Sequence, residues 1–202
     1  TGSTPPFSRW LWRGGQDAPP VARWERVLVL IAMTIALVLG TTNLGAPSLW
    51  HDELVHVFVA KNVAQSFEHR LPSGVFYANA YAYNYLLAGF IVLLGDGEFA
   101  VRLPSAIFGA LNVLLTYVVV RKLLGRSTAV VAAFMLAVFP WSVAWSREAR
   151  FYAMQQTLYL ATLLLGWRAF HSNGAKGAVV NFAGAVLAFL AGMLVSVQSA
   201  LF

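Results

Sequence analysis

The chain has 202 residues, of which 59% are hydrophobic and only 11% charged, against about a quarter charged in ordinary soluble domains. This composition excludes a water-soluble globule and predicts an all-α integral membrane protein. The net charge of +6 comes from basic residues scattered between apolar runs, which is typical of membrane flanks, so we expect no nucleic-acid partner. The absence of cysteine excludes disulfides and thiolate metal sites.

The N-terminal region divides into a tail and a first span. Residues 1–23 are rich in proline, glycine and arginine and cannot bury a core, so we expect a flexible cytoplasmic tail. Residues 24–44 are apolar and long enough to cross a hydrocarbon core of roughly 30 Å. Because the chain opens without methionine and closes inside an apolar run, we expect it to be the N-terminal part of a longer protein.

A long loop, residues 46–101, follows the first span. It should contain a short helix over residues 49–67, a break at Pro72 to Gly74, and an apolar segment over residues 81–95. That segment has about 15 residues, fewer than the 17 that a span needs, and it begins with several tyrosines. We therefore expect an interfacial helix there instead of a span.

Four further spans are predicted at residues 103–122, 127–145, 152–170 and 178–198, giving five in all. With this topology nine of the fourteen basic residues share the side of the N-terminus, whereas a spanning 81–95 segment would divide them seven to seven. The positive-inside rule therefore places the N-terminus in the cytoplasm and the 46–101 loop outside it. We expect a multi-pass protein of the cell membrane whose active site is extracytoplasmic.

The stretch Leu49 to Glu53 is the strongest candidate for chemistry, because adjacent carboxylates near lipid are costly to keep. Asp52 and Glu53 could instead serve as first-turn helix charges. Neighbouring helix residues point about 100° apart, so the two should not share a proton. His51 and His56 flank the pair, and His56 could orient a carboxylate, join Glu53 at a metal, or only pack.

Three arginines near span ends, Arg102, Arg147 and Arg150, face the same side as the carboxylates. Each could be an arginine that snorkels to the interface. Guanidinium groups beside paired carboxylates could also bind a phosphate-bearing lipid head group. We favour this second interpretation. No Walker loop or Gly-x-Gly-x-x-Gly motif occurs, so a cytoplasmic nucleotide sugar is not the expected donor.

Four stretches in order resemble the GT-C membrane glycosyltransferases, in particular the protein O-mannosyltransferase and lipid A aminoarabinose-transferase branch. They are Trp50 to Glu53, Glu98 to Ala106, Arg121 to Gly125 and Ser146 to Met154. The resemblance covers roughly residues 24–202, corresponding to the N-terminal part of a longer membrane module.

The resemblance implies transfer of a hexose or pentose from a polyprenyl-phosphate carrier to an acceptor at the external face, with inversion. By position, Asp52 would be the general base or orient the acceptor, with Glu53 beside it and Arg102 organising the carboxylates or the phosphate. Arg147, Arg150 and Tyr152 would lie near the carrier phosphate, and His51 and His56 would support the site. Membrane lipids are further expected partners, and the acceptor could be a protein, a lipid or a glycan.

One departure bears on cofactors and on the sugar. Where the aminoarabinose-transferase branch carries a Glu-Lys-Pro run with a metal-binding glutamate, this chain reads Tyr77 to Tyr81. The departure argues against aminoarabinose and leaves a divalent metal open. The alternatives to an enzyme are a non-catalytic subunit that binds the carrier lipid and, less favoured because the span interiors carry few ionisable groups, a transporter.

Overall fold

The computed structural model describes residues 20–172 and 174–196, which form helices and loops with one isolated β-bridge between Arg70 and Phe76. Most of the predicted tail, and the last residues of the predicted fifth span, lie outside these described residues. In chain order the helices are α2 (Arg23–Thr41), α3 (His51–Ser66), α4 (Tyr81–Leu94), α5 (Glu98–Leu124), α6 (Arg126–Val138), α7 (Pro140–Ser146), α8 (Tyr152–Phe170) and α9 (Ala175–Val195).

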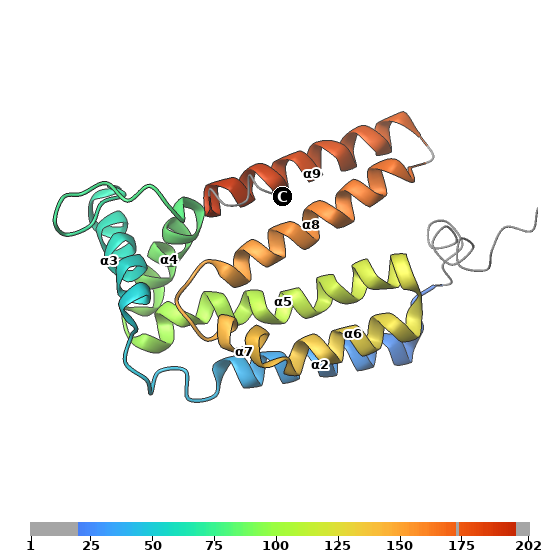
Figure 1. The fold of residues 1–202 in the computed structure, drawn as a ribbon, viewed down its shortest axis with the longest axis horizontal. Helices are drawn as coiled ribbons and strands as arrows, with labels where there is room; N and C mark the ends of the chain where they lie inside the picture. The colour runs from blue at the N-terminus through green and yellow to red at the C-terminus, as the bar shows by residue number, and fades with distance from the viewer. Residues whose placement is uncertain (1–19, 173, 197–202) are drawn as a thin grey trace, which may run out of the picture.

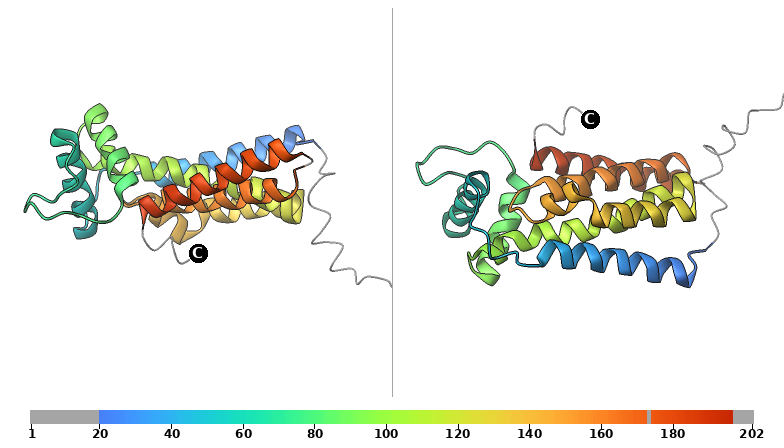
Figure 2. Two further views of the ribbon diagram at one scale, coloured as in Figure 1. Left: turned by 90° about the horizontal axis from the view of Figure 1, so that it is seen from above. Right: turned by 60° about the horizontal axis from the view of Figure 1, so that its bottom comes forward.

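Five helices, α2, α5, α6, α8 and α9, lie lengthwise beside one another, while α3 and α4 cover one end of this bundle (Figures 1 and 2). Large apolar side chains stay exposed along the outer helices, including Leu30 on α2, Val131 on α6 and Leu187 on α9. Such an apolar exterior is expected where the solvent is lipid. The all-helical membrane class predicted from composition is therefore confirmed.

Three helices, α2, α5 and α9, are long and apolar enough to cross a membrane, and the bent pair α6 and α7 would be a fourth if it forms one span. α8 packs along α9 but is less apolar and is not a candidate span by these criteria. Its crossing therefore stays a prediction. α4, with 14 residues, is too short to span, which fits the expected interfacial helix.

The third predicted span, residues 127–145, is not one straight helix. It breaks by 59° between α6 and α7, where Phe139 is extended and Pro140 begins the next helix. Proline has no N–H to donate and its ring clashes with the carbonyl four residues earlier. The residue before proline is also biased toward extended backbone, so the break has a local cause.

Small residues bring α7 against α5 and α2. A Cβ added at Gly109 would lie 2.5 Å from Cβ of Ser146, and one added at Gly40 would lie 3.3 Å from Oγ of the same serine. Deeper in the bundle, Asn112 on α5 donates to the carbonyl of Ala153 and accepts from Thr157 on α8. Close backbone approach and interhelical hydrogen bonds are the usual means of holding helices together in lipid.

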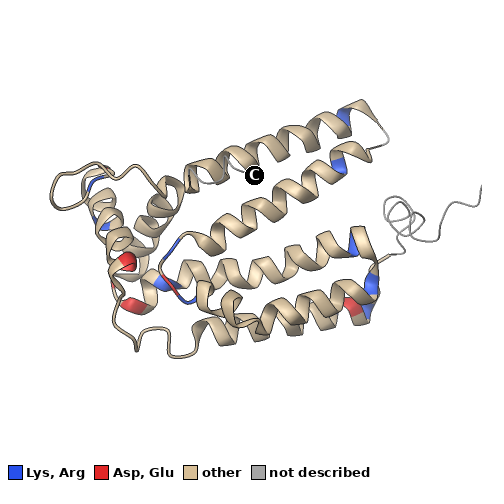
Figure 3. Cartoon of the chain, viewed as in Figure 1, with Lys and Arg blue, Asp and Glu red and all other residues tan. Residues whose placement is uncertain are grey.

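Charged residues gather at the two ends of the bundle (Figure 3). Away from α3 and α4, Glu25 accepts hydrogen bonds from Tyr117 at 2.6 Å and Arg121 at 2.8 Å, and lies 3.4 Å from Arg126. This buried cluster ties α2 to α5 and α6. The end that carries α3 and α4 holds a second group of charges, around Asp52 and Glu53.

Replacement of Gly109 by alanine should destabilise the protein, because the added methyl cannot fit against Ser146 without moving α7. We expect a loss of about 1–3 kcal/mol, read as a lower midpoint of thermal unfolding in detergent. Gly166→Ala in α8 is the matched control, since a Cβ there meets nothing within 4 Å. Equal midpoints for the two variants would show that the α5 and α7 contact is not tight.

Candidate functional site

The N-terminus of α3 separates the two adjacent carboxylates. α3 begins at His51 with Trp50 as N-cap, and Oε2 of Glu53 accepts the Trp50 backbone N–H at 2.9 Å. This contact turns Glu53 back into the protein, where its side chain is 1% exposed, while that of Asp52 is 61% exposed. The adjacent acids therefore have different environments, and the sequence-based view that they would not share a proton fits this arrangement.

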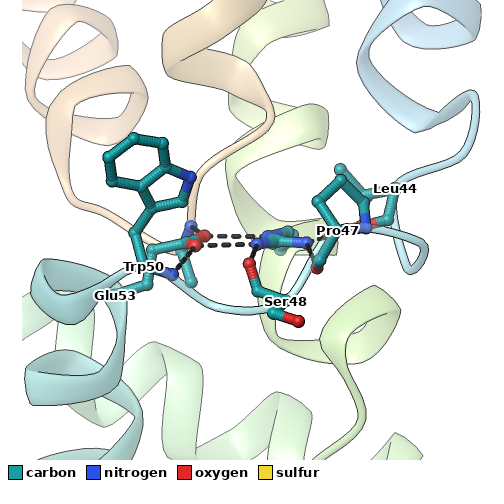
Figure 4. Close-up of polar contacts among 7 residues, drawn as sticks. Leu44, Pro47, Ser48, Trp50 and Glu53 are labelled. Atoms are coloured by element: carbon teal, nitrogen blue, oxygen red, sulfur yellow. Dashed lines mark hydrogen bonds and ion pairs between the residues drawn. The ribbon is translucent and has the colours of Figure 1, made fainter.

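Glu53 forms a buried ion pair with Arg102 of α5. Nε and Nη2 of the arginine donate to Oε1 and Oε2 of the glutamate at 2.8 and 2.7 Å, a two-pronged arrangement visible in Figure 4. The remaining guanidinium hydrogens go to backbone carbonyls of the loop after α2, those of Leu44, Pro47 and Ser48. A guanidinium has five N–H donors, and here they are all engaged, so Arg102 organises the carboxylate and the loop and has none left for a phosphate.

Glu53 also accepts the backbone N–H of Ala149 at 2.7 Å, which fixes the loop between α7 and α8. Burial by itself would raise the pKa of Glu53, but the hydrogen bonds from Arg102, Ala149 and Trp50 outweigh it and hold the pKa below the usual glutamate value. The carboxyl therefore stays ionised and paired. This environment suits a positioning group and not a base that must exchange protons.

Arg147 takes up a different structural position from the one its sequence context suggested. Its Nη1 donates to the carbonyls of Leu39 and Thr42 at 2.6 and 2.7 Å, at the C-terminal end of α2. Carbonyls at this end of a helix have no partner within the helix, and a cation there is favourable. The structure thus assigns Arg147 to the end of α2 and does not bring it to the cavity described next.

A cavity of about 580 Å³ opens beside the exposed face of α3. Of the residues predicted for the site, Asp52, His56, Arg150 and Tyr152 line it, whereas His51, Glu53, Arg102 and Arg147 do not. The full lining comprises Asp52, Val55, His56, Tyr77, Ala78, Asn79, Arg150, Phe151, Tyr152 and Ser196. Segments that are far apart in the sequence therefore meet at one polar and aromatic cavity.

Arg150 links the polar groups of this cavity. Its Nη1 lies 3.0 Å from Oδ2 of Asp52, its Nη2 donates to the hydroxyl of Tyr152, and its guanidinium carbon sits 4.5 Å from the centre of the Tyr152 ring. Nε of Arg150 is buried and has no hydrogen-bond partner among the described residues. Unlike Arg102, this arginine has a donor without a hydrogen-bond partner among the described residues, so its guanidinium is not fully engaged.

His56, one turn after Asp52, is buried at the back of the cavity and joined to a relay of polar groups. Nδ1 of His56 contacts Oδ1 of Asn84 at 3.0 Å, Nδ2 of Asn84 contacts Nε2 of His69 at 3.0 Å, and Nδ1 of His69 contacts the carbonyl of Tyr77 at 2.7 Å. Because a carbonyl only accepts and an amide nitrogen only donates, both imidazoles carry their proton on Nδ1. Burial lowers the pKa of His56 to about 4, so the ring is neutral.

The relay also holds the segment Tyr77 to Tyr81, where the sequence departs from the pattern of the aminoarabinose-transferase branch. His69 stacks on Tyr81 with ring centres 4.1 Å apart and binds the Tyr77 carbonyl, so that Tyr77, Ala78 and Asn79 border the cavity. Among the described residues, no three His, Asp or Glu side chains come together in a way that could hold a metal ion. The proposed pairing of Glu53 with His56 at a metal is not formed, since Glu53 turns toward Arg102.

Sequence reasoning missed His69, Asn84 and the contribution of Tyr77 and Asn79. They are remote from His56 in sequence and follow no recognisable spacing. One signal was available: Asn84 is the lone amide in the otherwise apolar and aromatic α4, where an amide without a partner would be costly.

Replacement of Glu53 by glutamine should leave the Arg102 charge buried without its counter-ion, at a cost of about 3–5 kcal/mol of stability. Since the folded-state pKa of Glu53 is lowered, the ion pair stabilises the protein above the unfolded glutamate pKa of about 4.3 and is lost as the pH falls toward the folded value. Thermal unfolding measured from pH 7 to pH 3 should show an acid loss in wild type that is smaller in Glu53→Gln. Exposed Glu68→Gln should behave like wild type, and an unchanged midpoint in Glu53→Gln would contradict the role of the pair.

Comparison with known proteins gives two similar crystal structures. ArnT from Cupriavidus metallidurans bound to undecaprenyl phosphate superposes with a TM-score of 0.75 at 16% identity, over 89% of this chain and 34% of that one. The apo state of ArnT from Cupriavidus metallidurans gives 0.70 and 16%, over 86% and 34%. This chain thus spans about a third of the length of those structures, and at this identity the likeness establishes the fold.

None of the curated proteins matches the sequence. Residues 79–202, more than half of the chain, match the family model described as dolichyl-phosphate-mannose-protein mannosyltransferase. The match includes α4 to α9, with Arg150 in the loop before α8 and Tyr152 at the start of α8. The chain therefore belongs to the dolichyl-phosphate-mannose-protein mannosyltransferase family and has the GT-C membrane fold.

Proposed function

We propose that this chain is the N-terminal part of a glycosyltransferase that moves a sugar from a polyprenyl-phosphate carrier to an acceptor at the extracytoplasmic membrane face. Asp52 is the general base and Arg150 binds the carrier phosphate. The observation that carries this assignment is the divided use of the adjacent carboxylates: Glu53 is buried against Arg102, whereas Asp52 stays exposed at a cavity beside Arg150.

The reaction needs a base and an anion site close together, and the cavity supplies both. The carboxylate of Asp52 takes the proton of the acceptor hydroxyl as its oxygen attacks the anomeric carbon. The bond from that carbon to the phosphate oxygen breaks, and its electron pair leaves with the phosphate, which needs no proton. Attack from the side opposite the leaving group inverts the anomeric centre.

Arg150 is suited to the leaving phosphate. A guanidinium pairs well with phosphate oxygens, and Nε of Arg150 is buried without a partner among the described residues. Its present partner at Nη1 is Asp52. A phosphate that takes over this guanidinium would release the Asp52 carboxylate toward the acceptor. The carrier bound to the similar ArnT structure, undecaprenyl phosphate, supports this class of donor.

The charge distribution supports an extracytoplasmic site. Arg23, Arg26, Arg121, Lys122 and Arg126 gather at the bundle end away from α3 and α4 (Figure 3), and Glu25 is the acidic residue among them. The end with the cavity carries acids and bases together. Basic segments stay in the cytoplasm, so the cavity faces the opposite side.

Asp52→Asn should reduce sugar transfer by about 10²–10⁴-fold, because the amide cannot accept the acceptor proton. The measurement is release of polyprenyl phosphate from a polyprenyl-phosphate sugar by the full-length protein in native membranes. Binding of undecaprenyl phosphate should persist, and exposed Glu68→Gln should transfer normally. Unchanged sugar transfer by Asp52→Asn would show that Asp52 is not the base. If the wild-type protein bound the carrier lipid but transferred no sugar, a non-catalytic subunit would be favoured.

Arg150→Gln should weaken binding of undecaprenyl phosphate by about 10-fold or more, since it removes a charge-assisted contact. Arg147→Gln is the matched control: it should lower the unfolding midpoint by freeing the α2 carbonyls and leave carrier affinity within about two-fold of wild type. Equal losses of affinity in the two variants would show that Arg150 acts only through the fold. Affinity is measured by titration of the purified full-length protein in nanodiscs.

A further inference from the structure

His56 occupies a place in the cavity that the transfer step does not use. The residue is 2% exposed, lines the cavity, and lies one helical turn after Asp52 on α3. Its ring is packed edge-on against Tyr77, Tyr83 and Phe151, with centre separations of 5.6–5.8 Å. Three aromatic contacts and one hydrogen bond hold the imidazole in a single orientation.

The relay behind His56 determines what its second nitrogen can do. Nδ1 donates to Asn84, whose own N–H is committed to His69. Among the described residues His56 makes no hydrogen bond through Nε2, and this atom is not among the fully buried, unpartnered ones. Nε2 therefore keeps a lone pair that no described residue occupies, on a residue that lines the cavity, and can accept a hydrogen bond.

Two features disfavour proton transfer by His56. Its Nδ1 partner is the neutral amide of Asn84, which does not stabilise an imidazolium as a carboxylate would. Burial is the largest influence that lowers the pKa of His56, and the Arg150 cation adds to it, whereas the hydrogen bond to Asn84 and the Asp52 carboxylate act in the opposite direction without overcoming it. A fixed, neutral hydrogen-bond acceptor is suited to selecting a ligand that carries a hydroxyl group at this place. A ligand without that hydroxyl would leave Nε2 of His56 without a hydrogen-bond partner, which is costly.

The rest of the lining fits a polyhydroxylated ligand. Tyr77 and Phe151 present rings around His56, Asn79 adds an amide, and Asp52 and Arg150 lie at the same cavity. Aromatic faces combined with a few fixed polar groups are what a small-molecule site uses to orient its ligand. The phosphate partner is Arg150, so the group that meets His56 belongs to the part of the donor beyond the phosphate.

We propose that His56 is a specificity-determining residue whose Nε2 accepts a hydrogen bond from a hydroxyl of the donor sugar, with Asn84 and His69 as positioning residues that fix its tautomer. The proposal rests on the proposed function, in that it takes the donor to be a polyprenyl-phosphate sugar. It adds that the sugar itself, and not only the phosphate, is recognised at the part of the cavity that α3 and the loop before α4 line.

The test compares the affinities of two lipids for the full-length protein in nanodiscs, polyprenyl-phosphate mannose and sugar-free undecaprenyl phosphate. His56→Leu should weaken binding of the mannose lipid by about 3–10-fold and leave the sugar-free lipid unchanged. His56→Gln should bind both like wild type, since its amide N–H can donate to Asn84 while its oxygen accepts from the sugar. His171→Gln, at the far end of the bundle, is the control substitution.

Several results would overturn the proposal. An equal loss of affinity for both lipids in His56→Leu would indicate a structural role for His56. Equal affinity of the wild-type protein for both lipids would show that this site does not recognise the sugar. A loss of transfer in His56→Gln as large as that in Asp52→Asn, with the affinities for both lipids unchanged, would show that His56 acts in the chemical step and not in recognition of the sugar. Failure of Asp52→Asn to affect transfer would refute the proposed base and leave the comparison of lipid affinities intact.

A second measurement tests the tautomer without any donor. Nitrogen NMR of protein labelled at histidine should show His56 with Nδ1 protonated and Nε2 unprotonated at neutral pH. Addition of polyprenyl-phosphate mannose should shift the Nε2 signal, whereas undecaprenyl phosphate should not. A protonated Nε2 in the free protein would contradict the relay.

Discussion

The buried pair between Glu53 and Arg102 is the contact on which the cavity end of the molecule depends. It joins the first turn of α3 to the first turns of α5, and through further hydrogen bonds it holds the loop after α2 and the backbone at Ala149. Removing two charges from water is expensive, and only such complete hydrogen bonding compensates for it. The pair thus sets where α3 begins and, with it, the direction in which Asp52 points.

The loop between α7 and α8 shows the same division between residues that hold the fold and a residue that faces the cavity. Arg147 stabilises the end of α2, Ala149 contacts Glu53, and Arg150 turns into the cavity toward Asp52. Ser105 on α5 adds a hydrogen bond to the Arg150 carbonyl. Three positions within four residues therefore serve different partners, and the Arg150 guanidinium is placed by the residues around it. Together with the contact between Arg150 and Tyr152, this scaffold holds an exposed carboxylate and a cation 3.0 Å apart.

Composition and hydrophobic run length predicted the helical membrane class and located the helices, including the short α3 and α4. They did not predict the break before Pro140. The length of an apolar run takes no account of a proline within it, which has no backbone N–H to donate and interrupts the helix. The sequence brought Asp52, His56, Arg150 and Tyr152 to attention, and these residues line the cavity. The sequence could not show which arginine meets which carboxylate: Arg102 pairs with Glu53, and Arg150 with Asp52. It also could not place Arg147, because the partners of that side chain are backbone carbonyls, which have no sequence signature.

The long helix α5 joins two buried ion pairs, one at each end. Arg102 meets Glu53 near the start of the helix, and Arg121 meets Glu25 near its end. The two arginines are nineteen residues apart, about 28 Å of helix at 1.5 Å per residue, close to the thickness of a bilayer's hydrocarbon core. α5 therefore carries a buried ion pair near each end of a stretch about as long as the hydrocarbon core is thick, so a bilayer of very different thickness would require the bundle to tilt or the lipid to deform.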